Sequence, residues 1–227
     1  MVSVPVSEIF TSIQGEGRYA GERHLFVRFH GCNINCPVCD EALKKANHYS
    51  MDSLFEAVDF SLAGDAPHQM IALTGGEPLL HANAIAALLV HISFSGRVLL
   101  ETNGTLFSEA ALLRDACHVF SMDYKLSSVW DVPSQEIAHE AFLPLLRAET
   151  DYIKIVVSQD LDEEEYMRAL NMIASRAPGV PVYLHPYESN NQEQITVEKI
   201  KNLHKRGIAI VDAIYALPRV QRVWRVR

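Results

Sequence analysis

Apolar runs of strand length recur along this chain, and a segment of helical character separates each run from the next. The runs are rich in Val, Ile, Leu and Phe and are flanked by Gly, Pro, Asn or Asp, as buried parallel strands are. A repeat of about 30 residues per strand and helix is typical of βα units. The sequence therefore predicts an α/β fold, a partial, open (β/α)6 barrel that ends in one further strand. The expected strands cover residues 24–30, 69–74, 97–102, 118–123, 151–157, 180–185 and 208–214, and the expected helices cover 51–62, 83–94, 108–116, 134–147, 162–176 and 195–206.

Length and composition bound the class of protein. With 227 residues, 48% of them hydrophobic, the chain can bury a full core, so we expect one domain over residues 1–227, with residues 1–23 as an N-terminal extension leading into the barrel. No apolar run approaches the roughly 18 residues of a membrane span, and no secretory signal is recognisable. A net charge of −8 argues against nucleic-acid binding. Four cysteines, three of them within eight residues, suit metal binding in a reducing cytoplasm better than a disulfide framework.

Residues capable of chemistry follow the expected strands. The carboxyl ends of the strands of a (β/α) barrel meet at one face, where active sites are assembled. We therefore expect one site along that rim. The segments that fall there are residues 31–41, Thr74-Gly75-Gly76-Glu77-Pro78, Glu101-Thr102-Asn103-Gly104, Ser121-Met122-Asp123-Tyr124-Lys125, Ser158-Gln159 and His185-Pro186.

The spacing of Cys32, Cys36 and Cys39 places three thiolates on one short loop. Three are one too few to close a tetrahedral zinc site or to hold all four irons of a cubane cluster. On a [4Fe–4S] cluster they would leave one iron open to a further ligand. The alternative is a zinc site completed by His30 or His48. Zinc ribbons usually present paired C-x2-C knuckles, and this chain has one such pair, so the sequence favours the cluster.

This loop, the Gly75-Gly76-Glu77-Pro78 run and the run MDYKLSS from Met122 to Ser128 resemble the motifs of radical S-adenosylmethionine (SAM) enzymes. The resemblance implies that the open iron chelates SAM and that SAM is cleaved reductively to a 5′-deoxyadenosyl radical. It also implies a barrel of the radical SAM type and a flavodoxin or ferredoxin reductant. The residues that would bind the cofactor are Gly75, Gly76, Glu77, Lys125, Ser158 and His185.

Two further features, the N-terminal run Gln14-Gly15-Glu16-Gly17 and Arg28, make the chain resemble one family in particular, the 7-carboxy-7-deazaguanine synthases. Together with the motifs above, this resemblance extends over nearly the whole chain. It implies a homodimer that converts 6-carboxy-5,6,7,8-tetrahydropterin to 7-carboxy-7-deazaguanine, on the route to queuosine, by hydrogen abstraction and ring contraction with loss of ammonia. The planar fork of Arg28 suits a substrate carboxylate, and Glu16 and Glu101 suit an edge of N–H donors. The implied substrate-binding residues are Gln14, Glu16, Arg28, Thr74, Glu101 and Asn103, of which Glu16, Arg28 and Glu101 are the expected catalytic residues.

The sequence departs from the family pattern at Asp40-Glu41. Relatives usually place Thr or Ser at the second position, where the hydroxyl ligates Mg2+. A carboxylate also suits Mg2+, so Glu41 is the expected metal ligand. The same change is compatible with an enzyme that lacks Mg2+ or acts on another substrate. Three alternatives therefore stay open: a relative acting on another deazapurine, such as a queuine lyase, a glycyl-radical activating enzyme, and a zinc-binding interaction module.

Overall fold

The computed structural model describes residues 3–37, 39, 44–64, 66–189 and 192–224. Within them the main sheet has nine strands in the order β11-β8-β7-β6-β5-β4-β2-β1-β3. The strands are β1 (Val4–Ile13), β2 (Arg23–Phe29), β3 (Asn47–Tyr49), β4 (Met70–Gly75), β5 (Arg97–Thr102), β6 (Val119–Tyr124), β7 (Tyr152–Val157), β8 (Val182–Pro186) and β11 (Ile214–Ala216), and β9 (Glu188–Ser189) with β10 (Gln192–Glu193) forms a separate ribbon. The helices are α1 (Met51–Leu62), α2 (Ala82–His91), α3 (Phe107–Leu113), α4 (Ser127–Trp130), α5 (Glu136–Phe142), α6 (Glu163–Arg176), α7 (Val197–Gly207) and α8 (Val220–Trp224), with 3-10 turns η1 (Gly17–Tyr19), η2 (Pro78–His81) and η3 (Leu143–Leu145).

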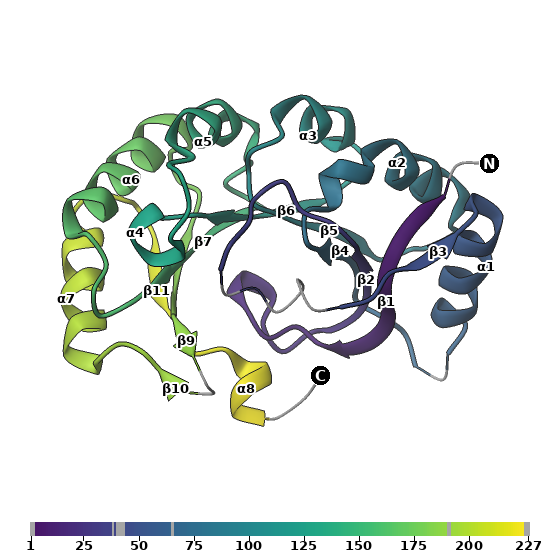
Figure 1. Cartoon of the computed structure of the whole chain (residues 1–227), viewed down its shortest axis with the longest axis horizontal. Coiled ribbons are helices and arrows are strands. Elements are labelled where there is room, and N and C mark those ends of the chain that lie inside the picture. The colour runs from purple at the N-terminus through teal and green to yellow at the C-terminus, as the bar shows by residue number, and fades with distance from the viewer. Residues whose placement is uncertain (1–2, 38, 40–43, 65, 190–191, 225–227) are drawn as a thin grey trace.

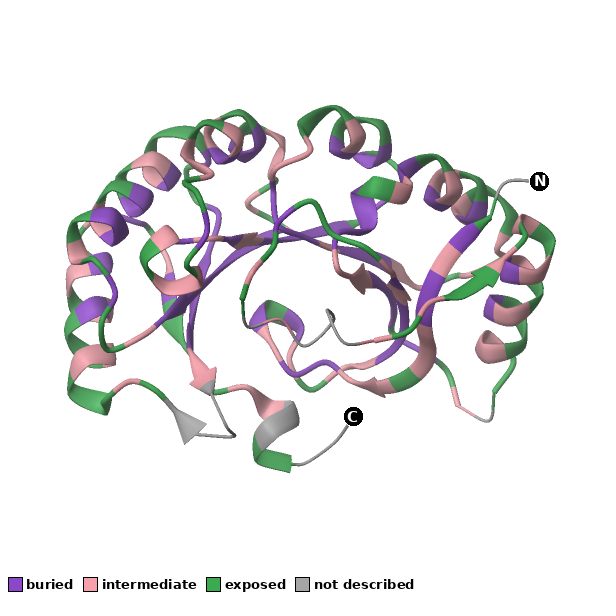
Figure 2. Cartoon of the chain, in the orientation of Figure 1, coloured by how far each residue is buried: buried purple, intermediate pink, exposed green. Residues whose placement is uncertain are grey.

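The sheet is a curved, open half-barrel whose outer side is covered by helices (Figure 1). Strands β2, β4, β5, β6, β7, β8 and β11 run parallel to one another, whereas β1 is antiparallel to β2 and to β3. The outer helices turn their buried side to the sheet and their exposed side outward (Figure 2). Among the described residues, no helix combines the length and the apolar character needed to cross a membrane.

Side chains alternate between two cores because successive residues of a strand point to opposite faces. On β6, Phe120 and Met122 join the large core beneath the helices, while Val119 joins a smaller core on the concave side. The same alternation on β7 sends Ile153 to the helices and Tyr152 inward. Toward the carboxyl ends the inward positions become polar. They are Arg28, Thr74, Glu101, Ser121, Asp123, Lys154 and His185, which we call the polar layer.

The α/β fold and the open half-barrel are confirmed, and the first six expected strands correspond to β2, β4, β5, β6, β7 and β8. The strand expected over 208–214 is wrong for most of its length, because α7 runs to Gly207 and β11 begins only at Ile214. The amides of Ile208, Ile210 and Val211 donate to carbonyls of the preceding helical turn, so they are not free for a strand ladder. The helix expected over 134–147 is shorter and ends in a 3-10 turn that contains Pro144.

Among the elements that lie where no strand or helix was expected, two matter for the site. The expected N-terminal extension contains β1, a strand of ten residues that pairs along β2. The short helix α4 follows β6. Both elements border the candidate site described next.

Candidate active site

Two glycines after β4 bring its turn against the cysteine loop. Gly75 has φ +124°, and a Cβ there would clash with the carbonyl oxygen of Phe29, while a Cβ on Gly76 would clash with that of Gly31. The close approach allows the amide of Gly76 to donate to Phe29 O at 3.1 Å and that of Glu77 to Gly31 O at 2.8 Å. Only glycine permits this backbone contact. Their expected contact with SAM stays a prediction.

The Glu77 carboxylate joins the ends of β4 and β5. It is fully buried and accepts hydrogen bonds from the amide of Asn103 at 2.7 Å, the hydroxyl of Thr102 at 2.9 Å and the amide of Leu79 at 3.1 Å. Burial raises the pKa of Glu77 to about 7, although these three donors oppose the shift. Glu77 therefore fixes the shape of the rim, and its expected contact with the SAM amino group stays a prediction.

The three loop cysteines line one cavity of about 280 Å3, together with His30, Gly31, Ile34, Asn35 and Gly76. Cys32 Sγ accepts from the amide of Ile34 at 3.4 Å and from Asn103 Nδ2 at 3.8 Å. Burial raises the pKa of Cys32 and of Cys36, and the charge of Lys125 opposes the shift at Cys36.

The arrangement of these thiols fits a cluster better than a single ion. Within the described part of the chain, no three His, Cys, Asp or Glu side chains converge closely enough to hold one metal ion. A [4Fe–4S] cluster binds each thiolate through a different iron, so its ligands are spread around a cavity. Of the two histidines considered as zinc ligands, His30 lines this cavity and its Nδ1 lies 3.3 Å from Ser7 Oγ, whereas His48 is not among the lining residues and its Nδ1 lies 3.0 Å from Ser3 Oγ.

A second cavity, of about 110 Å3, holds most of the expected substrate-binding residues. Its lining is Phe10, Ile13, Gln14, Gly15, Glu16, Phe26, Arg28, Thr74 and Glu101. Glu101 is its centre, because its carboxylate accepts from Gln14 Nε2 at 3.1 Å and from Thr74 Oγ1 at 2.7 Å. The rings of Phe10 and Phe26 stack at 5.2 Å and form an apolar wall. We call this cavity the carboxylate pocket.

Arg28 and Asn103 differ in their relation to this pocket. The guanidinium of Arg28 lies over the Phe10 ring at 5.1 Å, and its Nε is 3.6 Å from Glu8 Oε2, which Lys44 Nζ also contacts at 2.7 Å. Asn103 is not among the lining residues. Its side chain instead donates to Asn33 Oδ1 at 2.9 Å and faces Cys32. Asn103 therefore belongs to the cysteine side of the rim.

Glu16 is held in the carboxylate pocket by two cations that the sequence did not single out. Lys154 Nζ lies 2.9 Å from Glu16 Oε2, and Arg219 Nε lies 3.1 Å from Glu16 Oε1. Burial opposes ionisation of Glu16, yet the charges of Lys154 and Arg219 hold its pKa well below the usual value. His185 stands behind this turn: its Nε2 accepts from the amide of Gly17 at 3.3 Å, and its Nδ1 donates to Leu217 O at 3.0 Å. Burial lowers the pKa of His185.

Lys125 and Ser158 lie on the side of the rim formed by β6 and β7. Lys125 Nζ is 2.8 Å from Asp123 Oδ2 and 3.8 Å from the centre of the Trp130 ring. Ser158 lines a surface cavity of about 710 Å3 with Ser128 and Tyr187, separate from the lining of the cysteine cavity. The remaining expected site residue, Glu41, lies outside the described residues.

Comparison with known proteins agrees with this geometry. Residues 26–132 match the family model of the Radical SAM superfamily. The 7-carboxy-7-deazaguanine synthase of Clostridium acetobutylicum is 34% identical over 213 residues, which cover 93% of this chain and 94% of that protein. That of Archaeoglobus fulgidus is 32% identical over 233 residues and 97% of each chain. This chain belongs to the 7-carboxy-7-deazaguanine synthase family.

Family membership makes the chain a radical SAM lyase, whose cofactors are a [4Fe–4S] cluster and SAM. The fold agrees: the crystal structure of QueE from Escherichia coli superposes with a TM-score of 0.62 over 95% of this chain and 94% of that one, at 19% sequence identity. That likeness supports the half-barrel alone.

Lys154 and Arg219 are the site residues that the sequence reasoning missed. The run YIKIVV lies in the strand expected over 151–157 and belongs to the family resemblance, but no site role is assigned there to Lys154. The alternation of side chains between the two faces of the strand could have indicated its role. Lys154 stands two residues after Tyr152 and so lies on the same inward face. A lysine at an inward position of a buried strand is a strong sign of a polar site.

Proposed function

We propose that this chain converts 6-carboxy-5,6,7,8-tetrahydropterin to 7-carboxy-7-deazaguanine. The observation that carries the proposal is the carboxylate pocket, which unites Gln14, Glu16, Arg28, Thr74 and Glu101 at the end of the barrel that also bears the cysteine cavity. The curated relatives are named for the same product.

The cysteine cavity would hold the cofactors. Cys32, Cys36 and Cys39 would ligate the cluster, and Gly76 and Lys125 would lie beside SAM. When bound, these groups supply the 5′-deoxyadenosyl radical that abstracts hydrogen from the substrate. The amides and side chains around Cys32 stabilise its thiolate, and Glu77 keeps the turn after β4 in place.

The carboxylate pocket would bind and orient the pterin. Glu16 and Glu101 accept hydrogen bonds from its N–H edge, and Gln14 and Thr74 keep Glu101 in position. Arg28 would bind the substrate carboxylate with its planar fork, in place of its contact with Glu8. The stacked Phe10 and Phe26 rings suit a flat ring system and exclude water from it.

Anaerobically reconstituted protein, incubated with the pterin, SAM and a flavodoxin or ferredoxin system, tests the proposal. We expect 7-carboxy-7-deazaguanine and 5′-deoxyadenosine, and we expect Cys36→Ala to form neither while remaining folded. Cleavage of SAM without the deazaguanine would reject this substrate and would direct the search to other deazapurines.

Glu41 is our proposed Mg2+ ligand, supported by the hardness of its carboxylate oxygens. The same assay run with and without Mg2+ tests this, because a rate that does not respond to the metal would contradict it. A homodimer is proposed from the family, and light scattering of the purified protein measures it. The four free cysteines suit a cytoplasmic enzyme.

A further inference from the structure

Lys154 occupies an unusual position for a lysine. It lies on β7, in the middle of the sheet, with 7% of its side chain exposed. Its ammonium group is 2.9 Å from Glu16 Oε2 and 4.0 Å from Glu101 Oε1. Burying an ammonium group is costly unless its partners repay the desolvation. Lys154 therefore needs the two carboxylates, which come from the turn after β1 and from β5.

The two carboxylates need Lys154 in turn. Without it, Glu16 and Glu101 would share a buried pocket as like charges, near the further carboxylate of Asp123 on β6. Buried carboxyl groups in that situation take up protons and become donors. Arg219 contacts Glu16 on its other oxygen, and Lys125 contacts Asp123, so Lys154 is the cation placed between Glu16 and Glu101. The charged or titratable groups that surround the pair are Arg28 and His24 on β2, Asp123 on β6, Tyr152 on β7, His185 on β8 and Arg219 before α8.

We propose that Lys154 is a positioning residue for substrate recognition, which holds Glu16 and Glu101 oriented as acceptors for the N–H edge of the substrate and keeps Glu16 ionised. This inference rests on the proposed function. It assigns the pocket to bicyclic ligands that present adjacent N–H donors, such as 2-amino-4-oxo-pterins and deazaguanines. A protonated Glu16 would place a donor against a donor and would reject them.

Binding of 6-carboxy-5,6,7,8-tetrahydropterin to the reconstituted protein, measured anaerobically by calorimetry across roughly pH 6 to 8, tests the role of the charge. For the wild type we expect an affinity that changes little over this range. For Lys154→Met we expect binding weaker by about tenfold to a hundredfold near neutral pH, improving as the pH rises and Glu16 loses its proton. Lys154→Arg, which keeps the charge, should restore most of the affinity. If Lys154→Met does not fold, Lys154→Gln takes its place.

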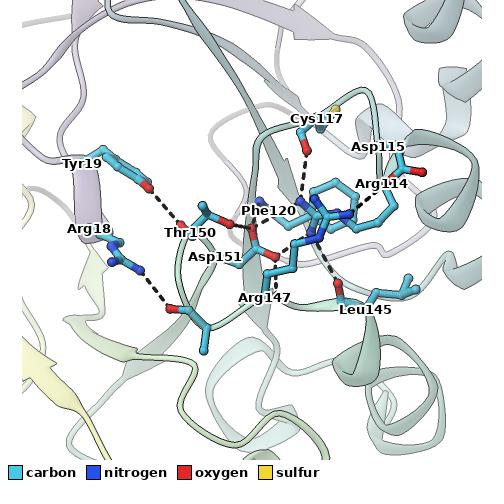
Figure 3. Close-up of polar contacts among 11 residues, drawn as sticks. Arg18, Tyr19, Arg114, Asp115, Cys117, Phe120, Leu145, Arg147, Thr150 and Asp151 are labelled. Atoms are coloured by element: carbon cyan, nitrogen blue, oxygen red, sulfur yellow. Dashed lines mark hydrogen bonds and ion pairs between the residues drawn. The ribbon is translucent and has the colours of Figure 1, made fainter.

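Arg114→Met is the matched control. Arg114 forms another buried ion pair, with Asp151 at 2.6 Å (Figure 3). Asp151 directly precedes β7, and neither residue lines the carboxylate pocket. We expect this variant to unfold more easily while its affinity for the pterin and the pH dependence of that affinity stay those of the wild type. A purely structural Lys154 would behave in the same way.

The results of these binding experiments distinguish a failure of the role of Lys154 from a failure of the proposed function. If the wild type binds the pterin and Lys154→Met binds it equally well at every pH, the role of Lys154 is refuted and the proposed function stands. A loss of affinity that is independent of pH, or that Lys154→Arg does not repair, also refutes it. If the wild type does not bind the pterin, the proposed function fails and this inference fails with it.

Discussion

His139 shows how a single neutral side chain supports the rim of the half-barrel. It is completely buried on α5, its Nε2 donates to the carbonyl of Asn103 at 3.0 Å, and its ring packs 4.2 Å from that of Tyr124. The amide of Asn103 is bound by Glu77, and its side chain by Asn33. His139 therefore holds, from the helix side, the turn that contacts the cysteine loop.

Acid should destabilise the protein through His139. Burial lowers its pKa to about 4, so the unfolded chain binds a proton at this residue between about pH 6.5 and pH 4 while the folded chain does not. The stabilisation is complete above pH 6.5 and is lost as the pH falls through this window, by at most about 3 kcal/mol. His139→Gln keeps an N–H donor without titrating there. Urea unfolding of the cluster-free proteins should show a smaller loss on acidification for the variant, and parallel curves would contradict the assignment.

At the scale of single residues, the sequence predicted the site residues that belong to recognisable motifs. It did not predict those whose place in the site depends only on how the chain folds. Gln14, Glu16, Arg28, Thr74 and Glu101 were expected to act together, and they line one pocket. Asn103 belonged to the same motif as Glu101 but faces the cysteine loop, because β5 ends at Thr102 and Asn103 lies in the turn that follows, where the alternation of the strand no longer applies. No site role was assigned to Lys154, because its function depends on the carboxylates of Glu16 and Glu101 that folding brings to it.

At the scale of elements, the short helix α4 depends on a carboxylate from another helix. Four residues are too few for stable helix formation on their own. Glu165 on α6 accepts from the amide of Ser127 at 2.6 Å and from the amide and hydroxyl of Ser128 at 3.0 and 2.6 Å. It thus caps α4 across space, as an N-cap side chain does within one helix. The helix ends in Trp130, whose ring covers Lys125.

Glu165→Ala should loosen α4 and leave α6 in place. Hydrogen bonds to a charged acceptor contribute about 1.5–3 kcal/mol each, so we expect the amides of residues 126–131 to exchange with deuterium at least tenfold faster. SAM should bind more weakly, because Lys125 and Trp130 lose their support. Glu164→Ala, an exposed neighbour on the same helix, is the control. Unchanged exchange at 126–131 in Glu165→Ala would show that α4 does not need the cap.

The elements that the sequence predicted are those with a continuous apolar signal. Buried parallel strands such as β5 and β7 have apolar side chains on both faces. In contrast, β1 mixes Ser and Thr with its apolar residues, contains Pro5 and pairs antiparallel near an edge of the sheet, so no such run marks it. The expected strand over 208–214 failed for the opposite reason. Its apolar residues lie in the turn that follows α7, where Ile208 is exposed, so an apolar run does not mark a strand there.

On the scale of the whole molecule, the two ends of the half-barrel have separate tasks. The cavities and the polar layer lie at the carboxyl ends of the strands. Near the amino ends of β6 and β7, Asp151 is a buried structural centre (Figure 3). It accepts from Arg114 Nη1 at 2.6 Å, from the amide of Phe120 at 2.8 Å and from the amide of Arg147 at 2.7 Å. This division is common in (β/α) barrels and separates stability from chemistry.

Asp151→Ala should therefore destabilise the fold without altering the site. Removing one partner of a buried ion pair leaves the charge of Arg114 uncompensated, which costs about 3–5 kcal/mol. We expect a lower urea midpoint for the cluster-free protein, together with an unchanged dissociation constant for the pterin in the reconstituted variant below its unfolding transition. Asp115→Ala removes an almost fully exposed partner of Arg147 and should change the midpoint little. Weaker pterin binding by folded Asp151→Ala would show that the two ends are coupled, since the altered residue lies outside the lining of both cavities.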